Sequence, residues 1–285
     1  MKSSYRLCPV LMYVLLTMTC REAVLAFGVE TPDAAAGSQS LPFKLYGGYL
    51  IVVDGQIGRL EHLKFALDTG ASSSIIDRKI ARKVALARQP GHTSQFGKPV
   101  SNQWILVPNL RFGPIAAANQ YLPTADLSIQ RLPTHVDVVI GVDLLNLSSF
   151  SIDNVSGQIF FGSTGGFVQP AKMATVEILV QGRPFRVVVD TGAKELILYQ
   201  DRVAGRIPNL TLVSELTWST IGSTVYARRV KLPGIFLGGI ELDQNCLLLE
   251  EPSSASPVDG YLGVAALRAK RVEFDLQNGA FRWAR

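Results

Sequence analysis

The chain has 285 residues, of which 47% are apolar and 18% charged, and this composition excludes an intrinsically disordered protein. The length is sufficient for two hydrophobic cores of about 100 to 120 residues each. The formal net charge is +5, and it falls to +3 without residues 1–26, which carry three basic side chains and one acidic side chain. Such a small net charge does not predict that the protein binds nucleic acid.

The first 26 residues have the pattern of an export signal. Lys2 and Arg6 provide a positive start, residues 7–19 are mostly apolar, and residues 24–26 suit cleavage before Phe27. An apolar stretch of this length is shorter than the roughly 20 residues of a membrane-spanning helix. We therefore expect a secreted or periplasmic protein without a membrane span in the mature chain, with a lipid anchor or a retained N-terminal tether as alternatives.

Residues 27–45 are predicted to be a flexible leader because proline, alanine, glycine and serine dominate the stretch before the first strand. After removal of the signal, Cys246 is the only cysteine, so no intramolecular disulfide can form. We expect this cysteine to be a small apolar residue inside a strand. Stability must then come from burial of apolar side chains.

Short apolar and β-branched runs bounded by turn residues indicate a mainly β protein. The clearest runs are residues 50–53, 176–180, 185–189, 235–237 and 246–249. Helical signal is sparse: the best candidate covers residues 77–88, and short helical turns are expected at 141–147 and 263–269.

The tetrapeptide Asp-Thr-Gly-Ala occurs twice, at residues 68–71 and 190–193. Farther along the chain, each copy is followed by two apolar residues and a glycine, at residues 139–141 and 261–263. The distance from aspartate to glycine is 141 − 68 = 73 residues in the first copy and 263 − 190 = 73 in the second. The two copies are offset by 190 − 68 = 122 residues, and this offset holds from the glycine strands to the chain end. Between each Asp-Thr-Gly loop and its glycine strand the offset becomes 125 residues, so that Gly113 corresponds to Gly238. The chain is therefore predicted to contain two related halves.

The most linker-like interior stretch is Gly-Ser-Thr-Gly-Gly at residues 162–166, where the repeat predicts the junction between the halves. We accordingly predict an N-terminal lobe over residues 46–164 and a C-terminal lobe over residues 165–285.

The two Asp-Thr-Gly-Ala loops, each followed by a glycine hairpin and an apolar-apolar-glycine strand, resemble those of the aspartic protease superfamily. The alanine after each motif and the sequence Ile-Gly-Val-Asp-Leu-Leu at residues 140–145 resemble its retroviral-like branch in particular. Retroviral enzymes are homodimers of one such lobe, whereas this chain holds both. Over residues 46–285, the resemblance implies an all-β, bilobal pepsin- or retropepsin-like fold. Two pseudo-twofold-related β-barrel lobes would enclose a cleft, and the protein would be a monomer.

Asp68 and Asp190 are the candidate catalytic residues. Two carboxyl groups held together cannot both ionise easily, so they share a proton and titrate as a pair. The ionised member can take a proton from water as the water attacks a peptide carbonyl, while the protonated member donates to the carbonyl oxygen. We therefore expect an endopeptidase that acts on extended polypeptides and requires neither a metal nor a cofactor.

Six further residues are predicted to support the two catalytic loops. They are Thr69, Gly70, Gly141, Thr191, Gly192 and Gly263. The resemblance implies that each threonine hydroxyl bonds to the opposite loop. The glycine after each threonine allows backbone N–H groups to approach the carboxylates, and the glycine of each apolar strand leaves room beneath the loop.

Ala71 and Ala193 occupy positions at which a hydroxyl could hydrogen-bond to the carboxylate and favour its charged form. With alanine at both positions we expect raised pKa values for the pair. The predicted pH optimum is about 5 to 7, well above that of an enzyme working near pH 2.

Two glycine-containing hairpins, at residues 93–103 and 217–225, are candidate flaps that close over an extended substrate. The candidate flap residues are Phe96, Gly97, Trp104 and Gly222. For the two aromatic residues, packing beside a hairpin is the alternative to substrate contact.

Other reaction types find little support in the sequence. The three histidines lack metal-ligand spacing, and neither a Gly-x-Ser-x-Gly elbow nor a Gly-x-x-x-x-Gly-Lys phosphate loop is present. Asp77 and Asp143 have no carboxylate counterpart in the other half, so we interpret them as local turn or capping residues.

Two alternatives to an active protease stay open. The same fold could bind peptides without cutting them, or it could serve as an interaction module of the cell envelope. Replacement of either aspartate distinguishes these hypotheses from an enzyme, because only an enzyme loses its function.

Overall fold

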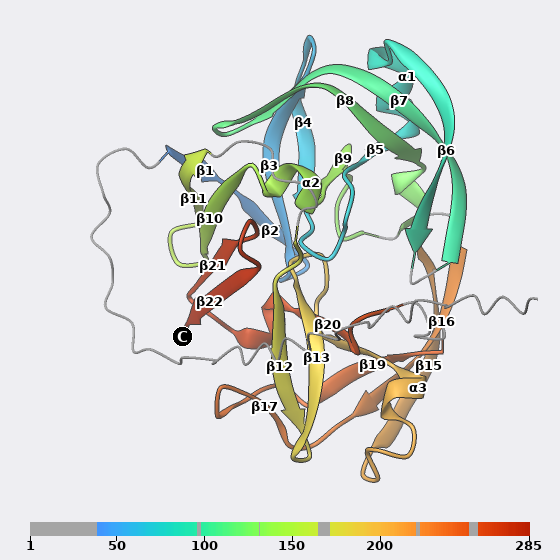
Figure 1. Ribbon diagram of the computed structural model, residues 1–285, viewed down its shortest axis with the longest axis vertical. Helices are drawn as coiled ribbons and strands as arrows, with labels where there is room; N and C mark the ends of the chain where they lie inside the picture. The colour runs from blue at the N-terminus through green and yellow to red at the C-terminus, as the bar shows by residue number, and fades with distance from the viewer. Residues whose placement is uncertain (1–38, 96–97, 131, 165–171, 221–222, 251–255) are drawn as a thin grey trace, which may run out of the picture. The chain divides into compact units, whose positions relative to one another are not determined.

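The computed structural model describes residues 39–285 except 96–97, 131, 165–171, 221–222 and 251–255 (Figure 1). The predicted export signal, most of the predicted leader and the start of the predicted C-terminal lobe lie outside the described residues. No helix within the described part of the chain is long and apolar enough to cross a membrane.

The N-terminal lobe is an eight-stranded sheet with the order β2-β3-β4-β9-β5-β8-β7-β6 (Figure 1). Its strands are β2 (Lys44–Tyr46), β3 (Leu50–Ile57), β4 (Leu60–Leu67), β5 (Ile75–Asp77), β6 (Ala87–Gln95), β7 (Lys98–Phe112), β8 (Ile115–Ala125) and β9 (Val138–Ile140). Strand β3 also pairs with β7, so the sheet curls back on itself. The helices of this lobe are α1 (Arg78–Val84), η1 (Leu127–Gln130) and α2 (Val142–Leu145).

The C-terminal lobe is a nine-stranded sheet with the order β15-β16-β19-β14-β20-β13-β12-β17-β18. Its strands are β12 (Thr175–Val180), β13 (Arg183–Asp190), β14 (Leu196–Tyr199), β15 (Thr211–Thr220), β16 (Ser223–Lys231), β17 (Ile235–Leu237), β18 (Ile240–Glu241), β19 (Asn245–Leu249) and β20 (Gly260–Gly263). Its helices are α3 (Gln200–Val203) and η2 (Val264–Leu267).

A third sheet contains strands from both halves of the chain, in the order β1-β11-β10-β21-β22. The strands are β1 (Gln39–Pro42), β10 (Ser148–Asp153), β11 (Gln158–Thr164), β21 (Arg271–Asp275) and β22 (Ala280–Ala284). Between β10 and β21, Phe150 lies opposite Phe274, and their stacked rings have centroids 5.1 Å apart. The halves are therefore joined by backbone pairing and by a shared apolar core.

The structure confirms a mainly β fold with two sheet-rich lobes, and the internal repeat is visible in strand register. In the parallel pair β4–β9, Ala66 lies opposite Val139, and in the parallel pair β13–β20, Val188 lies opposite Tyr261. Both partners are shifted by 122 residues. The offset of 125 also holds, because the β7–β8 and β17–β18 turns contain equivalent glycines with φ of +52° and +57°.

The predicted helix over residues 77–88 is too long. Helix α1 begins after Asp77, whose carboxylate accepts a hydrogen bond from the Lys79 N–H at 2.7 Å, and it ends at Val84. Residues 87–95 instead form β6, which pairs along its length with β7. Pairing with a distant strand overrides the local helical pattern here.

The end of the predicted leader is also a correction, because residues 39–42 and 44–46 are strands. Strand β1 pairs with β11, and β2 pairs with β3. Most side chains of β1 and β2 are exposed, so neither strand shows an apolar alternation in the sequence. Backbone pairing with partners elsewhere in the chain determines both strands.

Cys246 is completely buried in β19, as expected for an apolar packing residue. Burial raises the pKa of its thiol, and the nearby negative charge of Glu195 adds to the rise. The thiol is therefore neutral at physiological pH.

Candidate active site

The two Asp-Thr-Gly loops leave the ends of equivalent strands. Asp68 directly follows β4, and Asp190 is the last residue of β13. Beside each of these strands runs a parallel apolar strand, β9 or β20. The Asp68 N–H donates to the Ile140 carbonyl at 2.9 Å, which places the first aspartate next to Gly141.

Gly141 and Gly263 lie where a second strand passes close to each loop. A Cβ atom added to Gly141 would lie 2.7 Å from the Ala71 carbonyl oxygen, and one added to Gly263 would lie 2.6 Å from that of Ala193. Both contacts are with backbone atoms, which cannot rotate away. These positions therefore require glycine, as the sequence predicts.

The two threonines join the loops through four buried hydrogen bonds. The Thr69 N–H donates to the Thr191 hydroxyl oxygen, and the Thr191 N–H donates to that of Thr69, each at 3.0 Å. The Thr69 hydroxyl in turn donates to the Val189 carbonyl at 2.7 Å, and the Thr191 hydroxyl donates to the Leu67 carbonyl at 2.8 Å. Each hydroxyl thus connects its own loop to the strand that leads into the other.

The carboxyl groups of Asp68 and Asp190 meet and share a hydrogen bond. The Gly70 N–H donates to Asp68 at 3.0 Å, and the Gly192 N–H donates to Asp190 at 2.7 Å. A Cβ atom on Gly70 would lie 2.5 Å from the Asp190 carboxyl, and one on Gly192 would lie 2.7 Å from that of Asp68. Each glycine therefore supports its own aspartate and leaves room for the opposite one.

The pKa values of both carboxyl groups are raised, with burial as the main cause. Burial raises the pKa of Asp190, and the negative charge of Asp68 raises it further, to well above the usual value for aspartate. Burial also raises the pKa of Asp68, but hydrogen bonds from Asp190 and from the Gly70 and Ala71 N–H groups oppose this rise. Since the two groups titrate as a pair, they retain one shared proton well above the pH at which a free aspartate ionises.

Asp143 binds the N-terminal catalytic loop through Ser74, which lies 69 residues earlier in the chain. The sequence did not predict this role. It accepts hydrogen bonds from the Ser74 N–H at 2.9 Å and from the Ser74 hydroxyl at 2.7 Å. The Ser74 hydroxyl oxygen in turn accepts from the Gly141 N–H at 2.9 Å. The prediction of a local capping role is too narrow for both residues, because Asp77 caps α1 and also accepts a buried hydrogen bond from the Leu127 N–H at 3.0 Å. The serine run after the first motif was the available signal.

Both predicted flap regions are hairpins, formed by β6 with β7 and by β15 with β16. Phe96, Gly97 and Gly222 lie outside the described residues, so their role as flap residues stays a prediction. Trp104 lies in β7, and its ring covers Gly91 so closely that a Cβ atom there would lie 2.1 Å from the ring. This contact supports a packing role for Trp104.

In the C-terminal hairpin the position equivalent to Trp104 is occupied by Arg229, which forms an ion pair. Arg229 lies opposite Ser214, just as Trp104 lies opposite Gln89 at an offset of 125 residues. The Arg229 guanidinium donates to the Glu195 carboxylate at 2.8 Å. The two hairpins therefore have the same strand register but carry different side chains at this equivalent position.

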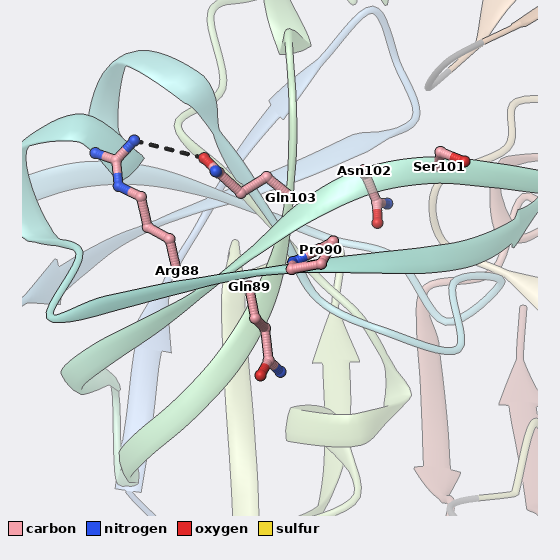
Figure 2. Close-up of a pocket in the computed structure, with 6 residues that line it drawn as sticks. All are labelled: Arg88, Gln89, Pro90, Ser101, Asn102 and Gln103. Carbon is pink, nitrogen blue, oxygen red and sulfur yellow. Dashed lines mark hydrogen bonds between the residues drawn. The ribbon is translucent and has the colours of Figure 1, made fainter.

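Two surface hollows of the described part of the chain lie away from the aspartate pair. Figure 2 shows one of about 410 Å³, lined by Arg88, Gln89, Pro90, Ser101, Asn102 and Gln103 of the β6–β7 hairpin. The Arg88 guanidinium donates to the Gln103 side chain across this hollow at 3.4 Å. A second hollow, of about 310 Å³, is lined by Arg78, Ala81, Arg82, Arg88, Gln103 and Thr124. No candidate catalytic residue lines either hollow.

The sequence model of the family described as "Aspartyl protease" matches the chain twice, over residues 53–144 and 175–266. The matched ranges are offset by 175 − 53 = 122 residues, and each contains one Asp-Thr-Gly loop with its glycine strand. The chain belongs to the aspartyl protease family. The resemblance to the retropepsin-like branch is confirmed, with two lobes fused in one chain. Comparison with curated protein sequences finds no match.

Within the described residues, histidine, cysteine, aspartate and glutamate side chains form no group of three that could hold a metal ion.

Proposed function

We propose that the protein is an aspartic endopeptidase, which hydrolyses peptide bonds through Asp68, Asp190 and an activated water. The observation that carries the proposal is the shared hydrogen bond between two carboxyl groups on equivalent loops, whose pKa values are both raised by burial of the carboxyl groups. Such a pair retains one proton over a wide pH range, so it offers a base and an acid at one point. Membership of the aspartyl protease family supports the same reaction.

In the proposed mechanism the charged member of the pair Asp68 and Asp190 accepts a proton from water, and the water oxygen attacks the peptide carbonyl carbon. The protonated member donates its proton to the carbonyl oxygen, which gives a tetrahedral diol intermediate. The pair then returns a proton to the amide nitrogen and accepts one from the diol as the carbon–nitrogen bond breaks. All atoms of one water molecule end in the products, and no covalent enzyme intermediate is needed.

The proposed substrate is a polypeptide in extended conformation, bound through backbone hydrogen bonds near the β6–β7 and β15–β16 hairpins. A monomer suffices because both catalytic loops belong to one chain. We further propose that the protein acts outside the cytoplasm, since its first 26 residues have the pattern of an export signal. A retained N-terminal tether would be compatible with this location.

The proposal is tested by incubating the full chain with denatured proteins from pH 3 to pH 8 and sequencing the products by mass spectrometry. We expect internal cleavages that pepstatin suppresses, with most product between about pH 5 and 7 because the pKa values of the pair are raised. A folded sample that yields no cleavage at any pH would favour the inactive peptide-binding hypothesis. A maximum below about pH 3 would contradict the pH argument.

A further inference from the structure

A run of positive charge follows the first catalytic loop. Residues 78–88 contain five basic side chains and no acidic one, namely Arg78, Lys79, Arg82, Lys83 and Arg88. All five residues are exposed. The corresponding stretch of the second half, residues 200–213, contains two arginines and one aspartate. The charge therefore belongs to the N-terminal lobe and is not part of the internal repeat.

Three of these basic residues surround one hollow, which has a volume of about 310 Å³. Its lining residues are Arg78, Ala81, Arg82, Arg88, Gln103 and Thr124. They come from α1, β6, β7 and β8, so four elements contribute to its wall. The hollow shown in Figure 2 adjoins it, because Arg88 and Gln103 line both.

The three guanidinium groups form no ion pair with any carboxylate in the described part of the chain. The two acidic residues near α1 have other partners. Asp77 accepts hydrogen bonds from two backbone N–H groups, and Asp126 accepts two from Ser128. Ser128 is also the main cause of the lowered pKa of Asp126, to which the charges of Lys79 and Arg78 add less.

The stability of α1 does not account for these arginines. Basic side chains are favourable in the last turn of a helix, which explains Arg82, but they are unfavourable in the first turn, where Arg78 stands. Arg78 and Arg82 are also four residues apart, so their like charges repel each other on one side of the helix. An anion between them would relieve this repulsion.

The C-terminal lobe shows that the fold does not require arginine at these positions. Gln200 and Ala204 are equivalent to Arg78 and Arg82 at the offset of 122 residues. Leu212 is equivalent to Arg88, because the residues opposite them in the partner strands are offset by 125. Three positive charges around one hollow are therefore a feature of the N-terminal lobe.

Two uncharged side chains add hydrogen-bond donors to the hollow. The side-chain oxygen of Gln103 accepts from Arg88 at 3.4 Å, so the amide nitrogen of Gln103 is left to donate (Figure 2). Thr124 is only 5% exposed, and its hydroxyl has no hydrogen-bond partner among the residues that the structure describes. A buried hydroxyl in this position is satisfied by a ligand that enters the hollow.

We infer that Arg78, Arg82 and Arg88 form a binding site for a phosphate group, to which Gln103 and Thr124 also donate. Each guanidinium presents its N–H donors as a planar fork that matches two oxygens of an anion. A phosphate group has at least three acceptor oxygens that point in different directions, so forks from separate elements can bind it together. A single carboxylate has only two oxygens and satisfies fewer of these donors.

The test measures binding of inorganic phosphate to the full chain by isothermal titration calorimetry, at constant pH and an ionic strength of about 0.15 M. We expect saturable binding. Arg78→Gln, Arg82→Gln and Arg88→Gln should each raise Kd by about 10- to 100-fold, because each removes charge-assisted hydrogen bonds. Arg82→Lys keeps the charge but loses the fork, so it should recover only part of the affinity.

Arg59→Gln is the matched control, because Arg59 is exposed in the turn between β3 and β4 and lines neither hollow. Its phosphate binding should equal that of the wild type, and circular dichroism confirms that every variant is folded. A wild type without saturable phosphate binding would overturn the inference. Arginine variants of the hollow that bind phosphate as tightly as Arg59→Gln would overturn it as well.

Vesicles distinguish a lipid headgroup from a soluble phosphate as the source of the ligand. The full chain is sedimented with phosphatidylcholine vesicles that contain or lack phosphatidic acid, whose phosphate group is terminal. Residues 1–26 are the same in all variants, so any membrane binding by this segment cancels in the comparison. If Arg82→Gln binds the phosphatidic acid vesicles more weakly than Arg59→Gln, the ligand is a lipid headgroup. If the two variants bind these vesicles equally while their Kd values for inorganic phosphate differ, the ligand is a soluble phosphate.

Discussion

Asp190 is more deeply enclosed than Asp68, although both residues stand in the same tetrapeptide: only 9% of the Asp190 surface is exposed, whereas Asp68 is half-buried. Burial nevertheless raises the pKa of both carboxyl groups, so the pair retains a shared proton before any substrate binds. A water molecule can therefore be activated without prior rearrangement of the pair.

The raised pKa of Asp190 predicts a pH-dependent stability. The folded pKa of Asp190 lies well above the unfolded value of about 3.9, so from pH 4 upward the folded state binds more protons than the unfolded state. Its contribution to stability is complete below pH 4 and is lost as the pH rises through the folded pKa. Asp190→Asn should therefore be more stable than the wild type at pH 7, by about 1.4 kcal/mol for each unit by which the pKa is raised.

Urea unfolding at pH 4 and pH 7 measures this effect, with Asp54→Asn as a control for an exposed carboxylate of the N-terminal lobe. The stability difference between Asp190→Asn and the wild type should grow with pH, whereas that of the control should not. An equal difference at both pH values would show that the pKa of Asp190 is not raised.

A second prediction concerns Gly192, which leaves room for the opposite carboxyl group. In Gly192→Ala the new Cβ atom would lie 2.7 Å from the Asp68 carboxyl carbon, so the pair must separate. Since a displacement of about 1 Å at a reacting group can cost about 100-fold in rate, we expect kcat to fall by at least that factor. Steady-state kinetics on a variant with unchanged circular dichroism measures the loss. Activity within a few-fold of the wild type would contradict the tight packing described here.

Among the structural elements, the two catalytic loops form one unit because the hydroxyl of each threonine is hydrogen-bonded to backbone groups of the other loop and of the strand that precedes it. The hydroxyl of Thr69 serves both the Thr191 N–H and the Val189 carbonyl, and both of these groups are buried. Its removal leaves two backbone groups without their partners. Both the stability of the fold and the alignment of the carboxyl groups therefore depend on this hydroxyl.

Thr69→Val should accordingly lower the free energy of unfolding by about 1 to 3 kcal/mol for each backbone group left unpaired. Thr69→Ser retains the hydroxyl and serves as the matched control, with a much smaller expected loss. Chemical denaturation of the three proteins measures the difference. Equal losses in both variants would indicate that the methyl packing of Thr69, and not its hydrogen bonds, holds the loops.

The parts of this architecture that the sequence predicts are those with a fixed local signature. The Asp-Thr-Gly loops, the glycine strands and the short helical turns after them recur at constant spacing in both halves, so the sequence alone is sufficient to assign Gly141 and Gly263. Strands β1 and β6 could not be assigned in this way, because partners elsewhere in the chain determine them. The contact between Ser74 and Asp143 could not be predicted either, because the two residues are 69 positions apart in the sequence.

At the scale of the whole molecule, the five-stranded sheet couples the two halves. Strand β10 from the first half pairs with β21 from the second, and their central phenylalanine rings stack. One cluster of buried residues includes side chains from both lobes and from this sheet. We therefore expect the described part of the chain to unfold in a single cooperative transition.

Phe150→Ala should lower the free energy of unfolding by about 3 to 5 kcal/mol, because Phe150 is only 3% exposed and stacks on Phe274. Phe160→Ala is the control, since this residue lies opposite Ser151 in the same sheet but is only partly buried. Differential scanning calorimetry reports both the size of the effect and the number of transitions. Two separate transitions in the wild type would contradict the coupling of the lobes.

The central claim is that one carboxyl group from each half forms a single catalytic centre, and the most direct measurement is peptide cleavage by Asp68→Asn and Asp190→Asn beside the wild type. We expect each single replacement to abolish cleavage, while Asp54→Asn, which replaces an exposed carboxylate away from the pair, cuts at the wild-type rate. Circular dichroism confirms that each variant is folded. If either active-site variant retains wild-type cleavage, the two carboxyl groups do not act as a pair and the central claim is wrong.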